Sequence, residues 1–347
     1  MPATKVVDWA TTLQPHLPVP IVSVKARQLQ SLWAGYGSVS ALTVQLQGQS
    51  RAEQLIAKEV RPPRDSGVGH ERKVKSYEVE AAFYSAVAPG LLEATGLGLP
   101  RPVAVEGGVR GQVAGQPGLT LVLSDLRPEF PQGAPGSLDL QQARVVLDWL
   151  AAYHARFWER PTPEGLQPQG TYWYLDTRRE EYGRMGRQWA DLKAVAEKLD
   201  ERLKAGGSQE FMTVVHGDTK GENILFSEDY SRCALYDFQY TGRSYGVRDV
   251  AYLLTSSVDS SDLERGYEGL MDHYHKQLSS QLSRQHGASG SAAAARYTPA
   301  VMRAHMDLAL LDYVRFMAGW GMWGSGCEWA VARARALLPR VGELLRK

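Results

Sequence analysis

The chain has 347 residues with 44% hydrophobic and 22% charged side chains, and its 39 Lys and Arg residues balance 38 Asp and Glu residues to a formal net charge of +1. This ordinary globular composition predicts one large domain or two lobes, and it argues against a nucleic-acid or anionic membrane partner. Two widely spaced cysteines, Cys233 and Cys327, and the lack of any long apolar run predict a cytoplasmic protein without a disulfide framework, a secretory signal or a membrane span.

The first third of the chain predicts a sheet. Five segments alternate apolar and polar residues and are rich in β-branched side chains, which is typical of half-buried strands. These predicted strands cover residues 20–30, 39–47, 53–60, 101–106 and 119–123. A Gly-Tyr-Gly-Ser turn over 35–38 separates the first two strands, and a glycine-rich hairpin loop over 107–118 separates the last two.

One helix is predicted within this sheet region. Residues 61–75 hold two prolines, two glycines and several charges, which predicts a mobile connection. Ser76 is the expected N-cap of the helix that follows, because apolar residues recur after it at helical spacing. We expect this helix to end at Pro89-Gly90.

The later chain predicts a helical lobe. Residues 128–136 are rich in proline and glycine and predict a crossover. The helices predicted after it begin at Ser137 and cover residues 180–204, 263–282 and 297–345, with a flexible loop over 286–295. The order of elements predicts an α+β protein with an N-terminal lobe over 1–124 and a helical lobe over 125–347. A cleft between two lobes is a common location for a small-molecule site.

The strongest chemical signal is a polar loop between two apolar runs. Residues 214–226 read VVHGDTKGENILF and present Asp218, Lys220 and Asn223. The next apolar run, CALY, then delivers Asp237 in the sequence DFQ. Hard oxygen ligands with one cation suit Mg²⁺ and phosphate oxygens, and phosphoryl transfer needs a base, metal ligands and a lysine.

His-Gly-Asp-x-x-x-x-Asn followed by Asp-Phe-Gln resembles the aminoglycoside phosphotransferase/choline kinase superfamily, and within it the ecdysteroid-kinase-like (CHK kinase-like) group. The resemblance implies a bilobal protein-kinase-like fold that moves the γ-phosphate of ATP, with Mg²⁺, to a hydroxyl of a small molecule. It implies Asp218 as the catalytic base and Asn223 and Asp237 as Mg²⁺ ligands. Lys220 sits where many protein kinases place a lysine that contacts the transferring phosphate, and Gly217 replaces the arginine of the kinase loop.

Upstream residues also match this resemblance. Lys58 ends Leu-Ile-Ala-Lys on the third predicted strand, similar to the kinase V-A-I-K pattern, which implies that it holds the α- and β-phosphates. Residues 76–84 resemble the family's Ser-Tyr-x-x-Glu-x-x-Phe-Tyr segment, which selects Glu80 rather than Glu78 as the partner of this lysine.

Two backbone segments are expected to contact the nucleotide. The turn with Gly35 and Gly37 would cover the phosphates with its N–H groups, although it lacks the third glycine of G-x-G-x-x-G and a plain hairpin turn is the alternative. Leu123, Ser124 and Asp125 resemble the family's interlobe hinge, whose backbone would bond the adenine edge. No Walker A sequence occurs, so a P-loop site is excluded.

Other prominent residues are expected to be structural. Asp249 matches the family's Asp-Leu-Ala helix start and predicts an N-cap that braces the catalytic loop. His216 is expected to be a scaffold histidine and His154 a satisfied core histidine. Trp320 and Trp323 are expected to pack in the core of the terminal helices, with a cation–π contact to a cationic acceptor as the alternative.

Two other functions compete with small-molecule phosphorylation. A Ser/Thr protein kinase would need an activation loop, but Phe-Gln rather than Phe-Gly follows Asp237, no Ala-Pro-Glu occurs, and a helix soon begins. A non-catalytic nucleotide-binding pseudokinase would be expected to have lost polar residues that this chain retains. The family's acceptors include amino alcohols, sugars, aminoglycosides and steroid-type alcohols, and fold does not choose among them.

Overall fold

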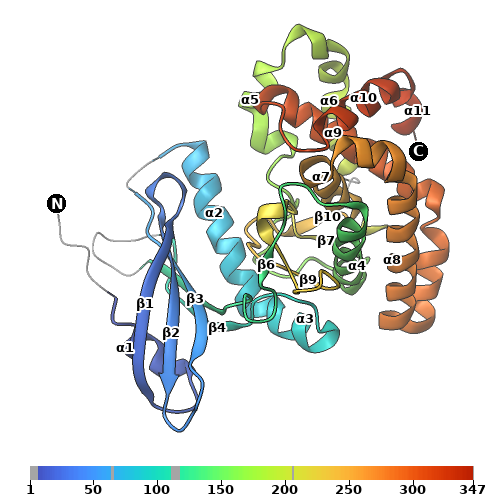
Figure 1. Cartoon of the computed structure of the whole chain (residues 1–347). Helices are drawn as coiled ribbons and strands as arrows, with labels where there is room; N and C mark the ends of the chain where they lie inside the picture. The colour runs from blue at the N-terminus through green and yellow to red at the C-terminus, as the bar shows by residue number, and fades with distance from the viewer. Residues whose placement is uncertain (1–6, 64–65, 111–117, 205–206, 347) are drawn as a thin grey trace. The chain divides into compact units, whose positions relative to one another are not determined.

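The computed structural model describes the chain except for residues 1–6, 64–65, 111–117, 205–206 and 347 (Figure 1). Two compact units make up the chain. Unit 1 consists of Met1–Gly90 and Pro100–Pro128, and unit 2 consists of Leu91–Leu99 and Glu129–Lys347. The lobe boundary between residues 124 and 125 stays a prediction.

Unit 1 is built on a five-stranded antiparallel sheet with the strand order β1-β2-β3-β5-β4 (Figure 1). Its strands are β1 (Ile21–Ser31), β2 (Gly37–Leu46), β3 (Glu53–Val60), β4 (Pro102–Glu106) and β5 (Leu119–Ser124). All five predicted strands are therefore confirmed. The predicted loop over 107–118 falls mostly on residues 111–117, which lie outside the described part of the chain.

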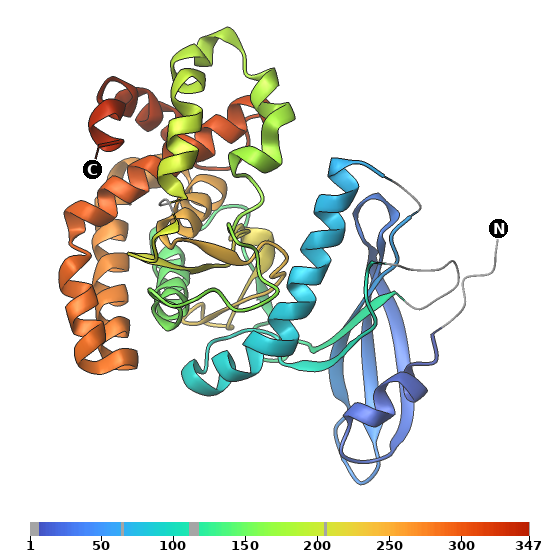
Figure 2. The same ribbon diagram turned by 180° about the vertical axis from the view of Figure 1, so that it is seen from behind.

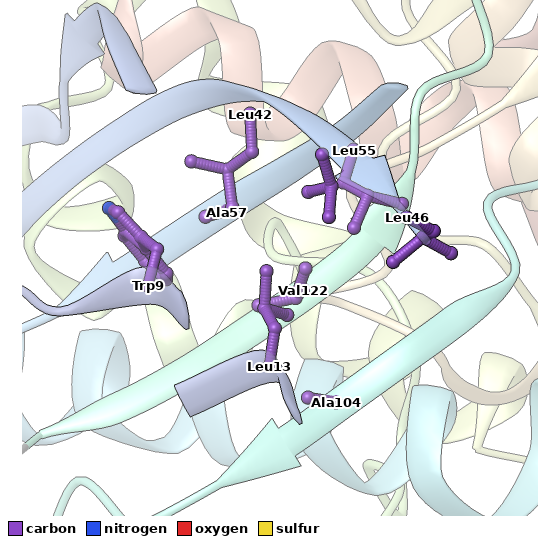
Figure 3. Packing of buried hydrophobic residues seen from close by; sticks show 9 residues of the cluster. Trp9, Leu13, Leu42, Leu46, Leu55, Ala57, Ala104 and Val122 are labelled. Carbon is purple, nitrogen blue, oxygen red and sulfur yellow. The ribbon is translucent and has the colours of Figure 1, made fainter. Parts of the chain in front are cut away.

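One face of this sheet packs against a short N-terminal helix, α1 (Trp9–Leu13), which the sequence analysis missed. Figure 3 shows the side chains of this core, contributed by α1 and by strands β2 to β5. The core consists of Trp9, Leu13, Leu42, Val44, Leu46, Leu55, Ala57, Ala104 and Val122. Alternate residues of β2 enter it because successive side chains of a strand point to opposite faces. Each fully buried Leu or Val side chain contributes about 1.5–3 kcal/mol relative to exposure.

The predicted start of the next helix at Ser76 is wrong. Helix α2 (Val68–Ala82) begins within the segment that was expected to be a mobile connection. Ser76 lies inside the helix, where its hydroxyl donates to the Lys73 carbonyl at 2.8 Å. Residues after Gly67 include several charged helix formers, and tertiary burial of Val74 and Tyr77 extends the helix to include them.

The predicted end at Pro89-Gly90 is also wrong. A π-helical turn over Phe83–Val87 leads directly into α3 (Ala88–Thr95), so Pro89 lies in a helix. Proline lacks the N–H of the ordinary helical bond and its ring collides with the carbonyl four residues earlier. The wider π turn immediately before Pro89 accommodates both effects.

Unit 2 combines long helices with two small sheets (Figures 1 and 2). Helix α4 (Leu140–Arg156) is capped by Asp139 rather than starting at Ser137, because the Asp139 carboxylate accepts the N–H groups of Gln141 and Gln142. Helices α4 and α8 (Ser260–Arg296) pack side by side. Strand β7 (Met212–Val215) pairs with β10 (Gly242–Tyr245), and β8 (Ile224–Phe226) lies between β6 (Gln132–Gly133) and β9 (Cys233–Leu235).

Helix α8 includes the residues 286–295 that were expected to form a flexible loop, so that prediction is wrong. The helix breaks at Gly287, which has φ +60°, and then turns back on itself. A Cβ atom on Gly290 would collide with the carbonyl oxygen of Leu282. The small residues of this segment therefore allow the second arm of α8, after Gly287, to pack closely against the first arm, before Gly287.

The remaining predicted helices are more segmented than expected. The helix predicted over 180–204 is divided at Gly186, which lies outside helical geometry with ψ 164°. It is replaced by α5 (Arg179–Arg184), a 3-10 turn over Arg187–Trp189, and α6 (Ala190–Leu203). Helix α7 (Val247–Ser257) precedes α8. Three helices follow α8: α9 (Pro299–Trp320), α10 (Cys327–Leu337) and α11 (Val341–Leu344). Among the described residues, no helix is both long and apolar enough to cross a membrane.

Candidate active site

In unit 1 a buried ion pair joins the sheet to α2. The Nζ atom of Lys58 lies 2.7 Å from the Oε2 atom of Glu80, and the two side chains are 10% and 3% exposed. Lys58 follows Ala57 on β3, so it faces away from the core under α1 and towards α2. The structure thus brings together the lysine and the glutamate that the sequence paired.

Glu78, the residue that was rejected as the partner, lies elsewhere on α2. Its Oε1 atom accepts the Nε group of Arg110 at 2.8 Å, and its side chain is 27% exposed. Arg110 also contacts Glu71. The two neighbouring glutamates therefore have different partners, one buried and one at the surface.

Two glycines, Gly35 and Gly37, lie at the turn that leads into β2, and both have a positive φ. Gly35 has φ +75°, and a Cβ atom on it would meet nothing within 4 Å. Gly37 has φ +141°, and a Cβ atom on it would collide with the carbonyl oxygen of Glu59 on β3. Gly37 is therefore required for the close approach of β2 and β3, whatever the turn binds.

The predicted hinge lies at the end of β5. Its Leu123 is buried at 7% exposure. The N–H of Ser124 donates to the Arg101 carbonyl at 2.9 Å, and the N–H of Asp125 donates to the Gln54 carbonyl at 3.0 Å. Both of these N–H groups therefore already bond within unit 1.

In unit 2 the loop between β7 and β8 presents Asp218. Its side chain is 4% exposed in the folded chain. The Oδ2 atom accepts Asn223 Nδ2 at 3.0 Å and lies 3.5 Å from Lys220 Nζ. The Oδ1 atom is buried and has no hydrogen-bond partner among the described residues. One oxygen of the carboxylate is thus held, and the other has no hydrogen-bond partner among the described residues.

The charge of Asp218 is set by opposing effects. Burial raises the pKa of the Asp218 carboxyl, Lys220 lowers it, Asp237 raises it, and the hydroxyl of Tyr252 lowers it. For Lys220, burial lowers the pKa of the ammonium, but the charges of Asp218, Asp237 and Glu222 outweigh burial and raise it overall. Lys220 therefore stays a cation beside two carboxylates.

Asn223 and Asp237 complete the predicted set. Asn223 donates from Nδ2 to both the carbonyl and Oδ2 of Asp218, at 2.9 and 3.0 Å, which directs its amide oxygen away from that residue. Asp237 follows β9 in the left-handed region with φ +70°, a strained conformation for a non-glycine residue that is common at functional sites. Its charge raises the pKa of both Asp218 and Lys220, so Asp237 lies within electrostatic range of the contacts that Asp218 makes with Lys220 and Asn223.

Asp249, which lies in the first turn of α7, stabilises this loop through hydrogen bonds to its backbone. Its carboxylate is fully buried and accepts the N–H groups of His216 and Gly217 at 2.7 and 2.9 Å. It also lies 3.1 Å from His154 Nε2, and His154 Nδ1 contacts the Tyr274 hydroxyl at 2.8 Å. The expected bracing is present, but Asp249 is not the N-cap, because Gly246 occupies that position. His154 is confirmed as a satisfied core histidine.

Two more residues of the loop are fixed by packing. A Cβ atom on Gly217, which has φ +86°, would collide with the Tyr240 carbonyl and lie 2.9 Å from the Thr171 nitrogen. No larger residue fits there without rearrangement. His216 is fully buried, its Nε2 contacts the Tyr236 carbonyl at 3.1 Å, and its Nδ1 accepts the Asp218 N–H at 3.2 Å, as a scaffold histidine should.

Of the two tryptophans near the end of α9, Trp323 packs against a buried core cluster as expected, and Trp320 does not. Trp323 is half-buried and its ring packs edge-on against Tyr252. Trp320 is 51% exposed, so its predicted core packing is wrong. The Arg178 guanidinium lies 5.0 Å from the Trp320 ring centroid and 5.1 Å from that of Tyr172. Trp320 therefore already contacts a cation of the chain itself.

Sequence reasoning missed Tyr172 and Tyr252, whose hydroxyl oxygens lie 2.9 Å apart. The charge of Asp218 raises the pKa of both tyrosines. Tyr252 lies three residues after Asp249 on α7, which is less than one helical turn. Because Asp249 was expected to contact the catalytic loop, this spacing was a weak indication that Tyr252 lies near the same loop. Tyr172 lies in an irregular segment before α5, where no periodicity could have identified it.

Comparison with known proteins supports this reading of the loop. The model of the Ecdysteroid kinase-like family matches residues 172–287, which is less than half of the chain but includes the segment from His216 to Asp237. The resemblance stated from the motif is confirmed for that segment. No curated protein sequence matches the chain.

Solved structures extend the similarity over nearly the whole chain. A microcompartment-associated aminopropanol kinase is 16% identical with a TM-score of 0.51, over 97% of each chain. A choline kinase from Cryptosporidium parvum Iowa II is 13% identical with a TM-score of 0.53, over 93% of this chain and 90% of that one. A putative aminoglycoside phosphotransferase from Ralstonia eutropha JMP134 is 12% identical with a TM-score of 0.50, over 97% of each. The chain has their protein-kinase-like fold, and the predicted fold class is confirmed.

Proposed function

We propose that this protein is an ATP- and Mg²⁺-dependent kinase that transfers the γ-phosphate to a hydroxyl of a small molecule. The observation that carries the proposal is the contact of Asp218 with Lys220 and Asn223 on one loop, together with the charge of Asp237, which raises the pKa of both Asp218 and Lys220. Phosphoryl transfer depends mainly on positioning and on neutralising the charge of the transferred group, which this set of side chains is suited to do.

In unit 2 each side chain has a proposed role. Asp218 accepts the proton of the acceptor hydroxyl, and its buried Oδ1 is the oxygen that no other residue engages among those described. Lys220 places a positive charge near the transferring phosphate. Asn223 and Asp237 offer the hard oxygen ligands that Mg²⁺ prefers.

The donor set fits a metal that is shared with phosphates. Among the described residues, no three His, Cys, Asp or Glu side chains are grouped to hold a metal by themselves. Mg²⁺ at nucleotide sites usually takes one or two protein oxygens, with phosphates and waters as its other ligands. When bound, the ion would neutralise charge on the triphosphate.

Unit 1 is proposed to hold the nucleotide. Lys58, fixed by Glu80, would contact the α- and β-phosphates, as its ion pair on β3 and α2 suggests. The turn with Gly35 and Gly37 would cover the phosphates. Backbone carbonyls in the segment from Leu123 through Ser124 to Asp125 would face the adenine edge.

The acceptor is proposed to be a small alcohol. Three solved structures with this fold are described as an aminopropanol kinase, a choline kinase and a putative aminoglycoside phosphotransferase, so amino alcohols and aminoglycosides belong in the first panel, with sugars and steroid-type alcohols. A protein acceptor is less well supported, because residues 238–246 are the whole connection between Asp237 and α7 and leave little room for an activation loop.

A screen of alcohols coupled to ADP release tests the proposal. We expect ADP release from Mg-ATP to rise with at least one small alcohol, to stay at background with casein, and to be lost in Asp237→Ala. Mass spectrometry of the alcohol should detect the added phosphate. Strong labelling of casein would support a protein kinase, and tight Mg-ATP binding without turnover on any acceptor would support a pseudokinase.

The two glutamates of α2 give a matched test of the nucleotide site. Glu80→Gln leaves Lys58 without its buried partner, and we expect KM for ATP to rise about tenfold, which is about 1.4 kcal/mol of lost binding. Glu78→Gln removes only a surface pair with Arg110, which is worth about 0–1 kcal/mol, and should leave KM for ATP unchanged. Equal effects of the two substitutions would contradict the assignment of Glu80.

A further inference from the structure

Three aromatic rings in unit 2 surround a cation that belongs to the chain itself. The guanidinium carbon of Arg178 lies 5.1, 5.4 and 5.0 Å from the ring centroids of Tyr172, Phe316 and Trp320. The rings also contact one another, because the Phe316 centroid lies 5.6 Å from each of the other two. We call these three rings the aromatic box. Such an arrangement binds cations, because the faces of aromatic rings carry negative potential.

The guanidinium is fixed inside the aromatic box. Arg178 is 5% exposed, and its Nε group donates to the Tyr172 carbonyl at 2.8 Å. Its Nη1 atom lies 3.4 Å from Oε1 of Glu181, which is also buried. Helices α5 and α9 approach closely here, since a Cβ atom on Gly319 would collide with the Glu181 carbonyl oxygen. Moving the arginine into water would leave Glu181 as an unpaired buried charge, which is costly.

Backbone contacts place the aromatic box beside the reactive loop. A Cβ atom on Gly217 would lie 2.9 Å from the Thr171 nitrogen, and the Thr171 N–H donates to the Tyr240 carbonyl at 3.0 Å. Asp218 and Tyr172 each follow one of the two contacting residues, so their Cα atoms are at most about 14 Å apart. The half-buried Tyr172 ring also lies 5.1 Å from the Tyr240 ring. The box is therefore within reach of an alcohol whose hydroxyl is bound at Asp218.

Two fully buried arginines hold the segment that carries Tyr172. On α7, Arg248 donates from Nη2 to the Thr171 hydroxyl at 3.3 Å. On α9, Arg315 donates from Nη2 to the Trp173 carbonyl at 2.7 Å. The residues on either side of Tyr172 are thus anchored to two helices, and this wall of the aromatic box is preorganised.

We propose that Arg178 is a specificity-determining residue: as the resident cation of the aromatic box, it excludes cationic alcohols and leaves uncharged alcohols as the acceptor class. The proposal rests on the proposed kinase function. A cationic amine gains affinity for aromatic rings by lying over their faces. On these three rings Arg178 takes that place, so a bound amine would lose its hydration without a compensating contact.

The exclusion acts through occupancy rather than through repulsion. Glu181 balances the charge of Arg178, so the occupied box carries little net charge. An uncharged alcohol does not need the inner ring faces and can pack its carbon atoms on Trp320, which is 51% exposed. Without the guanidinium, the three rings and the Glu181 carboxylate would together suit an alkylammonium group.

Two alcohols of the same shape test the proposal, because choline is positively charged and 3,3-dimethyl-1-butanol is not. Each is added as a competitor while ADP release from Mg-ATP and the best alcohol of the panel is measured. We expect the unsubstituted protein to bind the uncharged compound at least about tenfold more tightly than choline. In Arg178→Ala, the affinity for choline should rise about tenfold and that for the uncharged compound should change less than about twofold. Arg179→Ala removes the neighbouring, exposed arginine and should change neither affinity.

Thermal unfolding supplies a readout that does not depend on turnover. Arg178→Ala leaves the buried Glu181 without its cation, so this variant should unfold at a lower temperature than the unsubstituted protein. Choline should raise that temperature by binding in the aromatic box, and 3,3-dimethyl-1-butanol should not. If Arg178→Ala does not fold, its combination with Glu181→Gln removes both buried charges and replaces it in both measurements.

The outcomes separate this proposal from the proposed function. No turnover by the unsubstituted protein on any alcohol overturns the kinase function, even where choline stabilises Arg178→Ala. Choline binding by the unsubstituted protein that equals or exceeds binding of the uncharged compound overturns only the role of Arg178. The same conclusion follows if the folded variant gains no affinity for choline, or if Arg179→Ala gains as much.

Discussion

Substituting Asp218 by asparagine is expected to lower kcat about 10²–10⁴-fold, the usual contribution of a general base, and to leave Mg-ATP binding in place. Asparagine has nearly the same shape and can still accept the Asn223 amide with its side-chain oxygen, so the loop should keep its geometry. What it lacks is a group that takes the acceptor proton. ADP release measured with and without an alcohol, together with a direct measurement of Mg-ATP binding, checks both halves of the expectation.

The same substitution should not destabilise the fold. Burial raises the pKa of Asp218 in the folded protein, so the folded state binds the proton more tightly than the unfolded state. For this group, stability is therefore greatest at low pH and decreases as pH rises through the unfolded and then the folded pKa. At neutral pH, Asp218→Asn removes a charge that opposes folding, and its unfolding temperature should equal or exceed that of the original chain. A folded variant with unchanged kcat would rule out Asp218 as the base.

Substituting Asp249 by alanine is expected to reduce the free energy of unfolding by roughly 3–5 kcal/mol, as for a buried charged group whose partners are left unpaired. The substitution leaves the backbone N–H groups of His216 and Gly217 without an acceptor and removes the carboxylate next to His154. All of these groups are inside unit 2, where water cannot replace the lost bonds.

Asp139 is the matched control for this prediction. Its carboxylate also accepts two consecutive backbone N–H groups, from Gln141 and Gln142, but at an exposed helix start. Asp139→Ala should therefore cost only about 1 kcal/mol. Urea unfolding of both variants measures the difference, and similar losses for the two would show that the burial of Asp249 adds nothing to its bracing of the loop.

The sheet and the loop could be predicted because their signals are local. The second half of strand β2 alternates buried and half-buried residues, and this period of two in the sequence is enough to identify a strand with one buried face. Asp218, Lys220 and Asn223 share one short loop between apolar runs, so their spacing in sequence nearly determines their spacing in the protein. The pairing of Lys58 with Glu80 could not be predicted from local spacing. It was predicted from the resemblance of their two segments to a known family.

The wrong predictions come from tertiary contacts that override local preference. A proline normally ends a helix, but the π turn before Pro89 accommodates both its missing N–H and its ring, so the helix continues. The Gly, Ser and Ala residues of 286–295 look like a flexible loop, yet their small size is what lets the second arm of α8 pack on the first. Tyr172 and Tyr252 meet across a long sequence separation, and nothing in either segment encodes that contact.

The bonds to Asp249 have a consequence for the timescale on which the reactive loop can rearrange. The amide hydrogens of His216 and Gly217 point into a carboxylate surrounded by α4, α7 and α8, so they can exchange with deuterated solvent only when those helices separate. Such amides open with the global unfolding reaction rather than by local fluctuation. The loop is thus preorganised before any ligand arrives, and nucleotide binding has no disorder to remove at this point of the chain.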